Sequence, residues 1–168
     1  MLVYVDIISG DEMFSDALKI IDKGFLIEVE GKTVTRSDVL DESKIGANKS
    51  AEEVEEASEM ASVSGCDIIL NHKLQKTGFD KKQYSVYIKN YVKQLKEKLQ
   101  ESNPDRVNDF MKEAQAAVSQ LLKNFKNFDF YLGESSDPEG MVGLLDYRED
   151  GVTPYMVFFK DGLRIEKF

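Results

Sequence analysis

The chain has 168 residues, 42% of them hydrophobic and 32% charged, and we expect residues 1–168 to form one compact domain. Its 31 acidic residues against 22 basic ones give a net charge of −9, which disfavours general binding to nucleic acid. Apolar runs such as 68–70 and 156–159 are far shorter than the roughly 20 residues that span a bilayer. One cysteine and one histidine exclude a zinc site of the usual Cys and His type within the chain.

Short β-branched and aromatic runs bounded by turn residues predict strands. In chain order they are residues 2–8, 25–30, 32–36, 67–74, 128–132, 141–147, 155–160 and 163–167. The first run has no basic segment before it and is interrupted by Asp6, so we interpret it as a strand rather than a signal peptide and expect a cytosolic protein. Turns are expected at Gly31, at 149–151 and at Asp161-Gly162, the last as a two-residue hairpin.

Residues 10–16 follow the first predicted strand and place Asp11 and Glu12 beside Met13 and Phe14. Apolar residues next to carboxylates in a loop are typical of a contact surface. A turn whose Met13 and Phe14 fold back onto the sheet is an equally good interpretation. The sequence leaves both open.

The segment from 38 to 65 is predicted to be a long mobile loop, because it has few bulky apolar residues and many acids. Between Asp38 and Met60 eight acidic residues accompany two lysines. Carboxylate and amide oxygens are the ligands that Ca²⁺ prefers, but the EF-hand order is missing, so a site here would have a Kd on the order of 10⁻⁴ to 10⁻³ M. By composition alone, a solvated acidic loop is the stronger alternative.

A helical hairpin is predicted at about 81–126. Apolar residues between Tyr84 and Leu99 recur at the spacing that lines one helix face, and Asp80 with Gln83 forms a capping-box pattern. The break at Asn103-Pro104 suits the end of one helix and the start of the next. A second stripe runs from Val107 to Phe125. Strands and hairpin together predict an α+β fold.

The first predicted helix also has a basic face that could bind an acidic protein surface through charge complementarity. Such a face is more often simply solvated. Its lysines are Lys81, Lys82, Lys89, Lys93, Lys96 and Lys98.

Enzymatic turnover has little support in the sequence. Cys66 and His72 would lie roughly 20 Å apart along one predicted strand, too far apart for a nucleophile and its base. The Gly133-Glu-Ser135 stretch lacks the second glycine of a nucleophile elbow, and neither common phosphate-binding glycine motif is present. We therefore expect no catalytic residues.

Two stretches resemble the signatures of the translationally controlled tumour protein family. The first is Ile45-Gly-Ala-Asn-Lys-Ser-Ala-Glu52, and the second is Phe125–Glu134 followed by Pro138–Pro154. The opening Asp11–Asp16 and the ending Lys160–Leu163 are also similar to that family, and the resemblance covers the whole chain.

The resemblance implies an antiparallel β-tent (Mss4-like) core with an inserted α-helical hairpin and a long mobile acidic loop. It further implies a multifunctional protein of cell growth and survival that acts by protein–protein interaction. The partners it implies are tubulin and microtubules, a Ras-like small GTPase and apoptosis regulators of the Bcl family. It implies a cytoplasmic location, with nuclear or signal-independent secreted forms, a monomer, and no obligatory cofactor.

The same resemblance assigns residues to these roles. Glu12 matches an acid of the GTPase contact, and Asn48, Glu52 and Glu55 match suggested calcium positions. The basic hairpin matches the tubulin-binding region, for which we expect contacts from Lys81, Lys82, Lys89, Lys93 and Lys96.

We therefore expect a non-enzymatic, calcium- and tubulin-binding regulatory protein. The main alternative is a guanine-nucleotide exchange regulator of a Ras-like GTPase, which an exchange assay would separate from a simple binder. A third reading is a generic β-domain with chaperone-like activity, whose binding would not depend on the charge of the hairpin.

Overall fold

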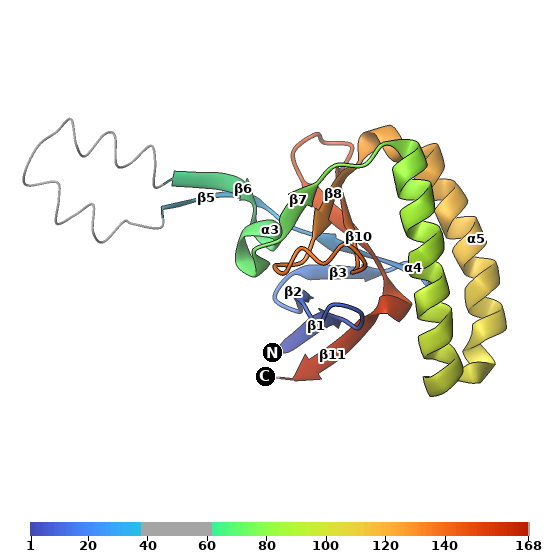
Figure 1. Ribbon diagram of the computed structural model, residues 1–168. Coiled ribbons are helices and arrows are strands. Elements are labelled where there is room, and N and C mark those ends of the chain that lie inside the picture. Colours follow the sequence, from blue (N-terminus) through green and yellow to red (C-terminus); the bar gives the residue numbers. More distant parts are fainter. Residues whose placement is uncertain (38–61, 168) are drawn as a thin grey trace, which may run out of the picture.

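The computed structural model describes residues 1–37 and 62–167, and the strands in these ranges form three antiparallel sheets (Figure 1). The first sheet has the order β11-β1-β2 and consists of β1 (Leu2–Asp6), β2 (Glu12–Ser15) and β11 (Leu163–Lys167). The second has the order β3-β4-β10-β9-β8-β7. Its strands are β3 (Lys19–Asp22), β4 (Leu26–Glu30), β7 (Gln75–Thr77), β8 (Asp129–Leu132), β9 (Gly143–Tyr147) and β10 (Pro154–Phe159). The third pairs β5 (Thr33–Ser37) with β6 (Ser62–Cys66).

The predicted α+β class with an antiparallel β-tent and an inserted helical hairpin is confirmed by this arrangement. Three short strands, β2, β3 and β7, were not predicted, because runs of three or four residues carry little periodicity. Residues 62–65, expected in the acidic loop, belong to β6. The rest of that expected loop, residues 38–61, lies outside the described residues.

The strand predicted at 67–74 is wrong, because most of this segment is a helix, α3 (Asp67–His72). Ile68 is fully buried while Ile69 is only partly covered. In an apolar run of only three residues, such a difference fits a helix as well as a strand, so the sequence could not decide between them. The helix ends at His72, and the left-handed backbone of its capping residue Lys73 (φ 53°) turns the chain so that the N–H of Leu74 donates to the carbonyl of Ile69 at 3.0 Å.

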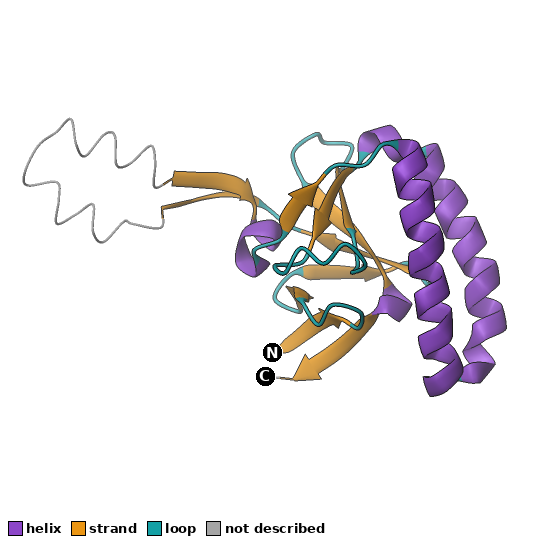
Figure 2. Cartoon of the chain, in the orientation of Figure 1, coloured by secondary structure: helices purple, strands orange, loops and turns teal. Residues whose placement is uncertain are grey.

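The hairpin consists of α4 (Lys81–Ser102) and α5 (Val107–Lys123), joined through a short 3₁₀ turn at Pro104–Arg106 (Figure 2). The predicted capping box starts α4: the Asp80 carboxylate accepts from the Gln83 N–H at 2.7 Å, and the Gln83 side chain accepts from the Asp80 N–H at 3.0 Å. These reciprocal bonds satisfy two donors that the first helical turn leaves free.

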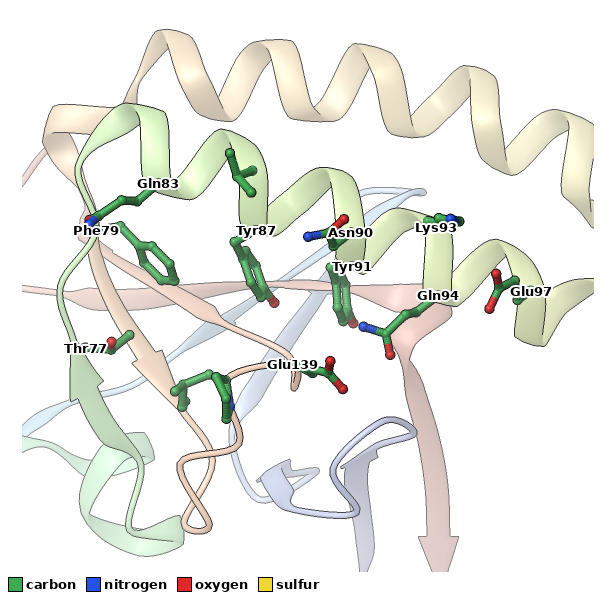
Figure 3. Close-up of a pocket in the computed structure, with 13 residues that line it drawn as sticks. Thr77, Phe79, Gln83, Tyr87, Asn90, Tyr91, Lys93, Gln94, Glu97 and Glu139 are labelled. Atoms are coloured by element: carbon green, nitrogen blue, oxygen red, sulfur yellow. The ribbon is translucent and has the colours of Figure 1, made fainter.

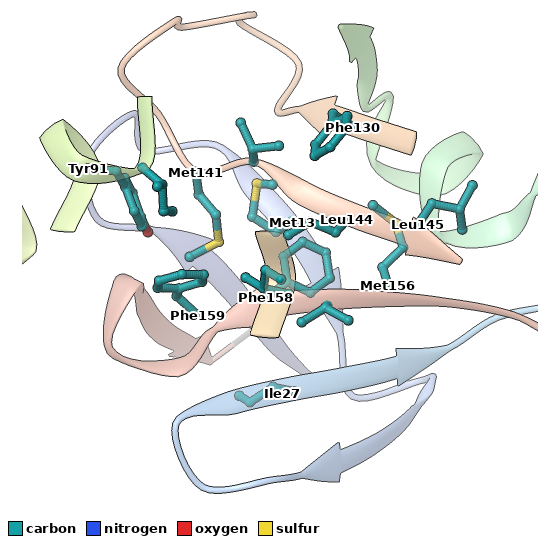
Figure 4. Packing of buried hydrophobic residues seen from close by; sticks show 14 of the residues in the cluster. Met13, Ile27, Tyr91, Phe130, Met141, Leu144, Leu145, Met156, Phe158 and Phe159 are labelled. Atoms are coloured by element: carbon teal, nitrogen blue, oxygen red, sulfur yellow. The ribbon is translucent and has the colours of Figure 1, made fainter. Parts of the chain in front are cut away.

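Aromatic side chains attach both helices to the six-stranded sheet. From α4, Tyr91 packs edge-on against Phe159 of β10, with ring centroids 5.6 Å apart. From α5, Phe110 packs against Phe25 at 5.4 Å. Figure 4 shows Tyr91 and Phe159 next to Met141, within the cluster of buried side chains that covers the sheet. The hairpin is therefore part of the hydrophobic core rather than a free arm.

Met13 and Phe14 belong to this core as well, since neither side chain is exposed. Phe14 stacks on Tyr4, with ring centroids 4.5 Å apart, and packs at a tilt against Phe158 at 4.8 Å. Of the two readings of residues 10–16, the one with buried Met13 and Phe14 is therefore right, although they lie in strand β2 rather than in a turn.

The two-residue hairpin predicted at Asp161-Gly162 is wrong. Strands β10 and β11, on either side of it, belong to different sheets, and residues 160–162 form a 3₁₀ turn. A side chain at Gly162 would collide with the hydroxyl of Tyr91, so glycine is required here for close packing rather than for a positive φ. Gly151, in the turn predicted at 149–151, does have a positive φ of 70°.

The loop 133–142 between β8 and β9 is fixed by polar contacts from other elements. The carboxylate of Asp6, which is fully buried, accepts from the N–H of Met141 at 2.7 Å. The hydroxyl of Tyr87 donates to the carbonyl of Gly140 at 2.7 Å and accepts from the N–H of Val142 at 3.1 Å. These bonds hold the loop beside α4.

Candidate functional site

The lysines predicted to bind tubulin form one stripe along α4. Lys82, Lys89, Lys93 and Lys96 lie at i, i+7, i+11 and i+14, and such positions share a face of an α-helix. Lys81 is the first residue of the helix. The stripe is about 21 Å long, because a helix rises about 1.5 Å per residue. We call these five residues the lysine stripe.

The lysine stripe faces solvent. Lys81, Lys82, Lys89 and Lys93 are exposed and Lys96 is half-buried. None of the five forms an ion pair with an acidic residue that the structure describes. By contrast, Arg106 in the turn of the hairpin contacts both Glu113 and Asp161. The stripe thus offers free positive charge on a chain whose net charge is negative.

Glu12 lies at a second surface, where β2 begins. A small depression of about 240 Å³ is lined there by residues of the 10–12 segment, the end of α3 and the start of the 133–142 loop. The side chain of Glu12 is about half exposed, and its carboxylate is 3.7 Å from Nδ1 of His72. Lys73 and Glu134 approach to 3.9 Å at the same place. Sequence reasoning found Glu12 but not its basic neighbours, because it predicted a strand where α3 lies.

Asp11 fixes the backbone beside Glu12. Its carboxylate accepts from the Ser135 hydroxyl at 2.6 Å and from the Ser135 N–H at 3.3 Å. A side chain at Gly133 would collide with Asp11, so the 10–12 segment and the loop after β8 are packed closely together. Glu12 is therefore presented from an ordered backbone, with its own carboxylate left accessible.

The imidazole of His72 responds to this environment. Burial lowers the pKa of His72, because it disfavours the charged form, and the nearby carboxylate of Glu12 partly offsets this effect. The unfolded chain therefore binds this proton more readily than the folded one. The stability that follows from this difference is fully present above pH ~6.5, the ordinary value for histidine, and is lost as the pH falls through the lowered pKa.

Replacing Glu12 with glutamine should lower the pKa of His72 further, since it removes the charge that favours the imidazolium. His72 is the one histidine in the sequence, so its ring signals can be followed by NMR from pH 8 to pH 4.5 without assignment. Glu149→Gln, an exposed change in the β9–β10 turn, is the control and should leave the titration unchanged. An equal or higher pKa in Glu12→Gln would contradict the pairing.

Cys66 and His72 do not form a reactive pair. The expectation that they lie along one strand is wrong, because Cys66 is the N-cap of α3 and His72 is the last residue of that helix, yet the two side chains still have different neighbours. Cys66 is buried, its sulfur is 3.9 Å from the Asp67 carboxylate, and burial raises the pKa of its thiol. A buried thiol with a raised pKa is a poor nucleophile.

The predicted calcium ligands Asn48, Glu52 and Glu55 lie outside the described residues. Within residues 1–37 and 62–167, no group of three or more His, Cys, Asp or Glu side chains is arranged to hold a metal ion. In the same residues, no helix has the length and apolar character needed to span a membrane.

The fold places the chain in the class of β-tent proteins that carry a helical hairpin, and comparisons with known proteins make the assignment specific. A family model described as translationally controlled tumour protein matches residues 1–164. The chain is 59% identical over 170 residues to the translationally-controlled tumor protein homolog of Danio rerio and 54% identical over 171 residues to the translationally-controlled tumor protein of Homo sapiens, with 99% of each chain covered.

Solved structures agree with this result. The translationally controlled tumor-associated protein of Schizosaccharomyces pombe superposes with a TM-score of 0.82 at 49% identity, over 100% of both chains. The chain therefore belongs to the translationally controlled tumour protein family, which confirms the resemblance seen in the sequence.

Proposed function

We propose that this chain is a non-enzymatic regulatory protein of cell growth that binds other proteins, with tubulin and microtubules as partners of the lysine stripe. The observation that carries the proposal is the row of five lysines on α4 without ion pairs to described residues. Acidic segments at the microtubule surface would complement this row. Binding of this kind is long-range and weakens with salt.

Reversing three charges of the lysine stripe should weaken microtubule binding at least tenfold at about 50 mM salt. The variant is Lys81→Glu/Lys82→Glu/Lys89→Glu, in which all three side chains are exposed. Lys23→Glu/Lys76→Glu/Lys167→Glu makes the same change of net charge at exposed lysines elsewhere. Co-sedimentation with microtubules measures the affinity of each variant.

The control should stay within about threefold of the wild type, and added salt should reduce the difference between the two variants. Equal loss in both variants would show that only net charge matters. Unchanged binding in the stripe variant, or wild-type binding that is indifferent to salt, would refute the lysine stripe as the contact.

Regulation of a Ras-like small GTPase is a second candidate, and the accessible carboxylate of Glu12 favours it. A carboxylate brought next to bound nucleotide would compete for its Mg²⁺ and repel its phosphates, which weakens nucleotide retention. In an assay of fluorescent GDP release from a purified GTPase, Glu12→Gln should abolish any acceleration and Glu149→Gln should keep it. Equal release with the wild type and Glu12→Gln would discard this role.

Calcium binding is proposed as a weak, optional property of Asn48, Glu52 and Glu55. Lys49 stands next to Asn48 in the sequence, and its positive charge should weaken a cation site further. Titration of the labelled protein with calcium to millimolar concentration should shift NMR signals of residues 38–60. The absence of shifts there would remove the proposal. Contacts with Bcl-family regulators and a cytoplasmic location stay predictions from the family.

A further inference from the structure

A groove of about 650 Å³ lies between α4 and the 133–142 loop (Figure 3), and it adjoins the lysine stripe at Lys93, which is part of its lining. From α4 it is lined by side chains that recur at helical spacing between Gln83 and Glu97. Pro138 and Glu139 of the loop form the opposite wall, and Leu132 of β8 contributes to the lining.

The groove is preformed. Tyr87 connects its two walls, because its hydroxyl, on α4, forms hydrogen bonds with the backbone of Gly140 and Val142 in the loop. The buried carboxylate of Asp6 holds Met141 from the other side. A ligand would therefore not have to order the walls, which removes one of the usual costs of binding.

Amide side chains face this groove from α4. Asn90 and Gln94 both line it, and their side chains make no hydrogen bond with a residue that the structure describes. Each primary amide offers a donor and an acceptor. The two residues are one helical turn apart, about 6 Å, which is close to the ~6.8 Å at which an extended chain repeats backbone groups on one side.

The remaining lining differs between the two ends. Towards the start of α4 it is apolar, with Phe79 and the 57% exposed Val86. Towards the other end Glu97 lines it from the helix, and Figure 3 shows Glu139 of the loop near Gln94 and Tyr91. From Val86 to Glu97 the helix rises about 16 Å, which is the length of roughly five residues of extended chain.

We propose that this groove binds an extended peptide segment of a partner protein, with an apolar residue near Val86 and a basic residue near Glu97 and Glu139, about five positions apart. An extended segment has free backbone donors and acceptors for Asn90 and Gln94, whereas a helix has already paired its own. Two carboxylates against one lysine, Lys93, disfavour a phosphate-bearing ligand.

The test uses a phage-displayed library of random octapeptides on the immobilised full chain. The proposal expects enriched peptides with an apolar residue and an Arg or Lys four to six positions apart. One such peptide, synthesised with a fluorescent label, is then measured against variants by anisotropy. Asn90→Ala/Gln94→Ala should weaken its binding roughly tenfold, and Glu97→Gln/Glu139→Gln should remove the preference for the basic residue over alanine.

The matched control is Gln100→Ala/Gln115→Ala, which removes two amides from exposed positions of the hairpin outside the groove and should bind within about twofold of the wild type. NMR shifts caused by the peptide should centre on residues 79–97 and 132–142. Failure to enrich any peptide above uncoated wells, or equal affinity for the groove variant and the wild type, would overturn the proposal. These variants leave Lys81, Lys82 and Lys89 unchanged, so either result is independent of the microtubule test.

Discussion

Replacing Asp6 with alanine should lower the free energy of unfolding by about 3–5 kcal/mol, because it leaves one buried and three partly buried donors without their acceptor. The carboxylate accepts from the N–H groups of Ile8 and Met141 at 3.0 and 2.7 Å, and from the Ser9 hydroxyl and N–H at 2.6 and 3.3 Å. Urea denaturation followed by circular dichroism measures the loss.

A conservative variant and a surface control test whether the loss comes from these hydrogen bonds. Asp6→Asn keeps the size of the side chain but turns an NH₂ group towards backbone donors, so it should lose part of the stability, about 1–3 kcal/mol. Glu149→Ala removes an exposed acid and should stay within about 0.5 kcal/mol of the wild type. If Asp6→Ala were as stable as Glu149→Ala, the hydrogen bonds to Asp6 would not contribute to the stability of the fold.

Truncating Phe110 to alanine should cost about 3–5 kcal/mol, as is typical of a fully buried aromatic side chain in a core. Phe110 is completely buried and is the contact of α5 with Phe25, which in turn packs on Phe159 at 5.3 Å. The cavity would lie where the second helix meets the sheet. The same urea experiment gives the change in stability.

The control for this helix is Lys112→Ala, two residues along α5 and exposed, which should change stability by no more than about 0.5 kcal/mol. Because the hairpin shares one hydrophobic cluster with the sheet, Phe110→Ala should still unfold in one transition. A loss below about 1 kcal/mol, or a separate early transition of the helices, would show that the hairpin does not belong to the common core.

The long elements could be predicted from sequence because each repeats one pattern several times. Helix α4 has its capping box at the expected residues and ends at Ser102, just before Asn103-Pro104. The short elements could not be predicted, because each is too short to repeat its pattern. In α3 the run of Ile68, Ile69 and Leu70 satisfies either a strand or one helical turn, and only packing against β2 decides between them.

The candidate site was found in part. Sequence patterns located the lysine stripe, and family resemblance located Glu12, because both depend on the residues themselves. The neighbours of Glu12 come from distant parts of the chain, and no local sequence pattern predicts that His72 and Glu134 lie beside it. Asp6 looked like a mere interruption of an apolar strand. Its value as a buried acceptor depends on Met141, 135 positions later.

The helices α4 and α5 leave the sheet after β7 and return at β8, and these two strands are direct neighbours, with Gln75 opposite Leu132. A tight turn would be enough to join them, so strand connectivity does not require the excursion. Shortening it would nevertheless strip the cover from Phe130 and Phe159, which contact Tyr84 and Tyr91. The hairpin is thus not needed to connect the two strands, but it is needed to shield this side of the sheet from water.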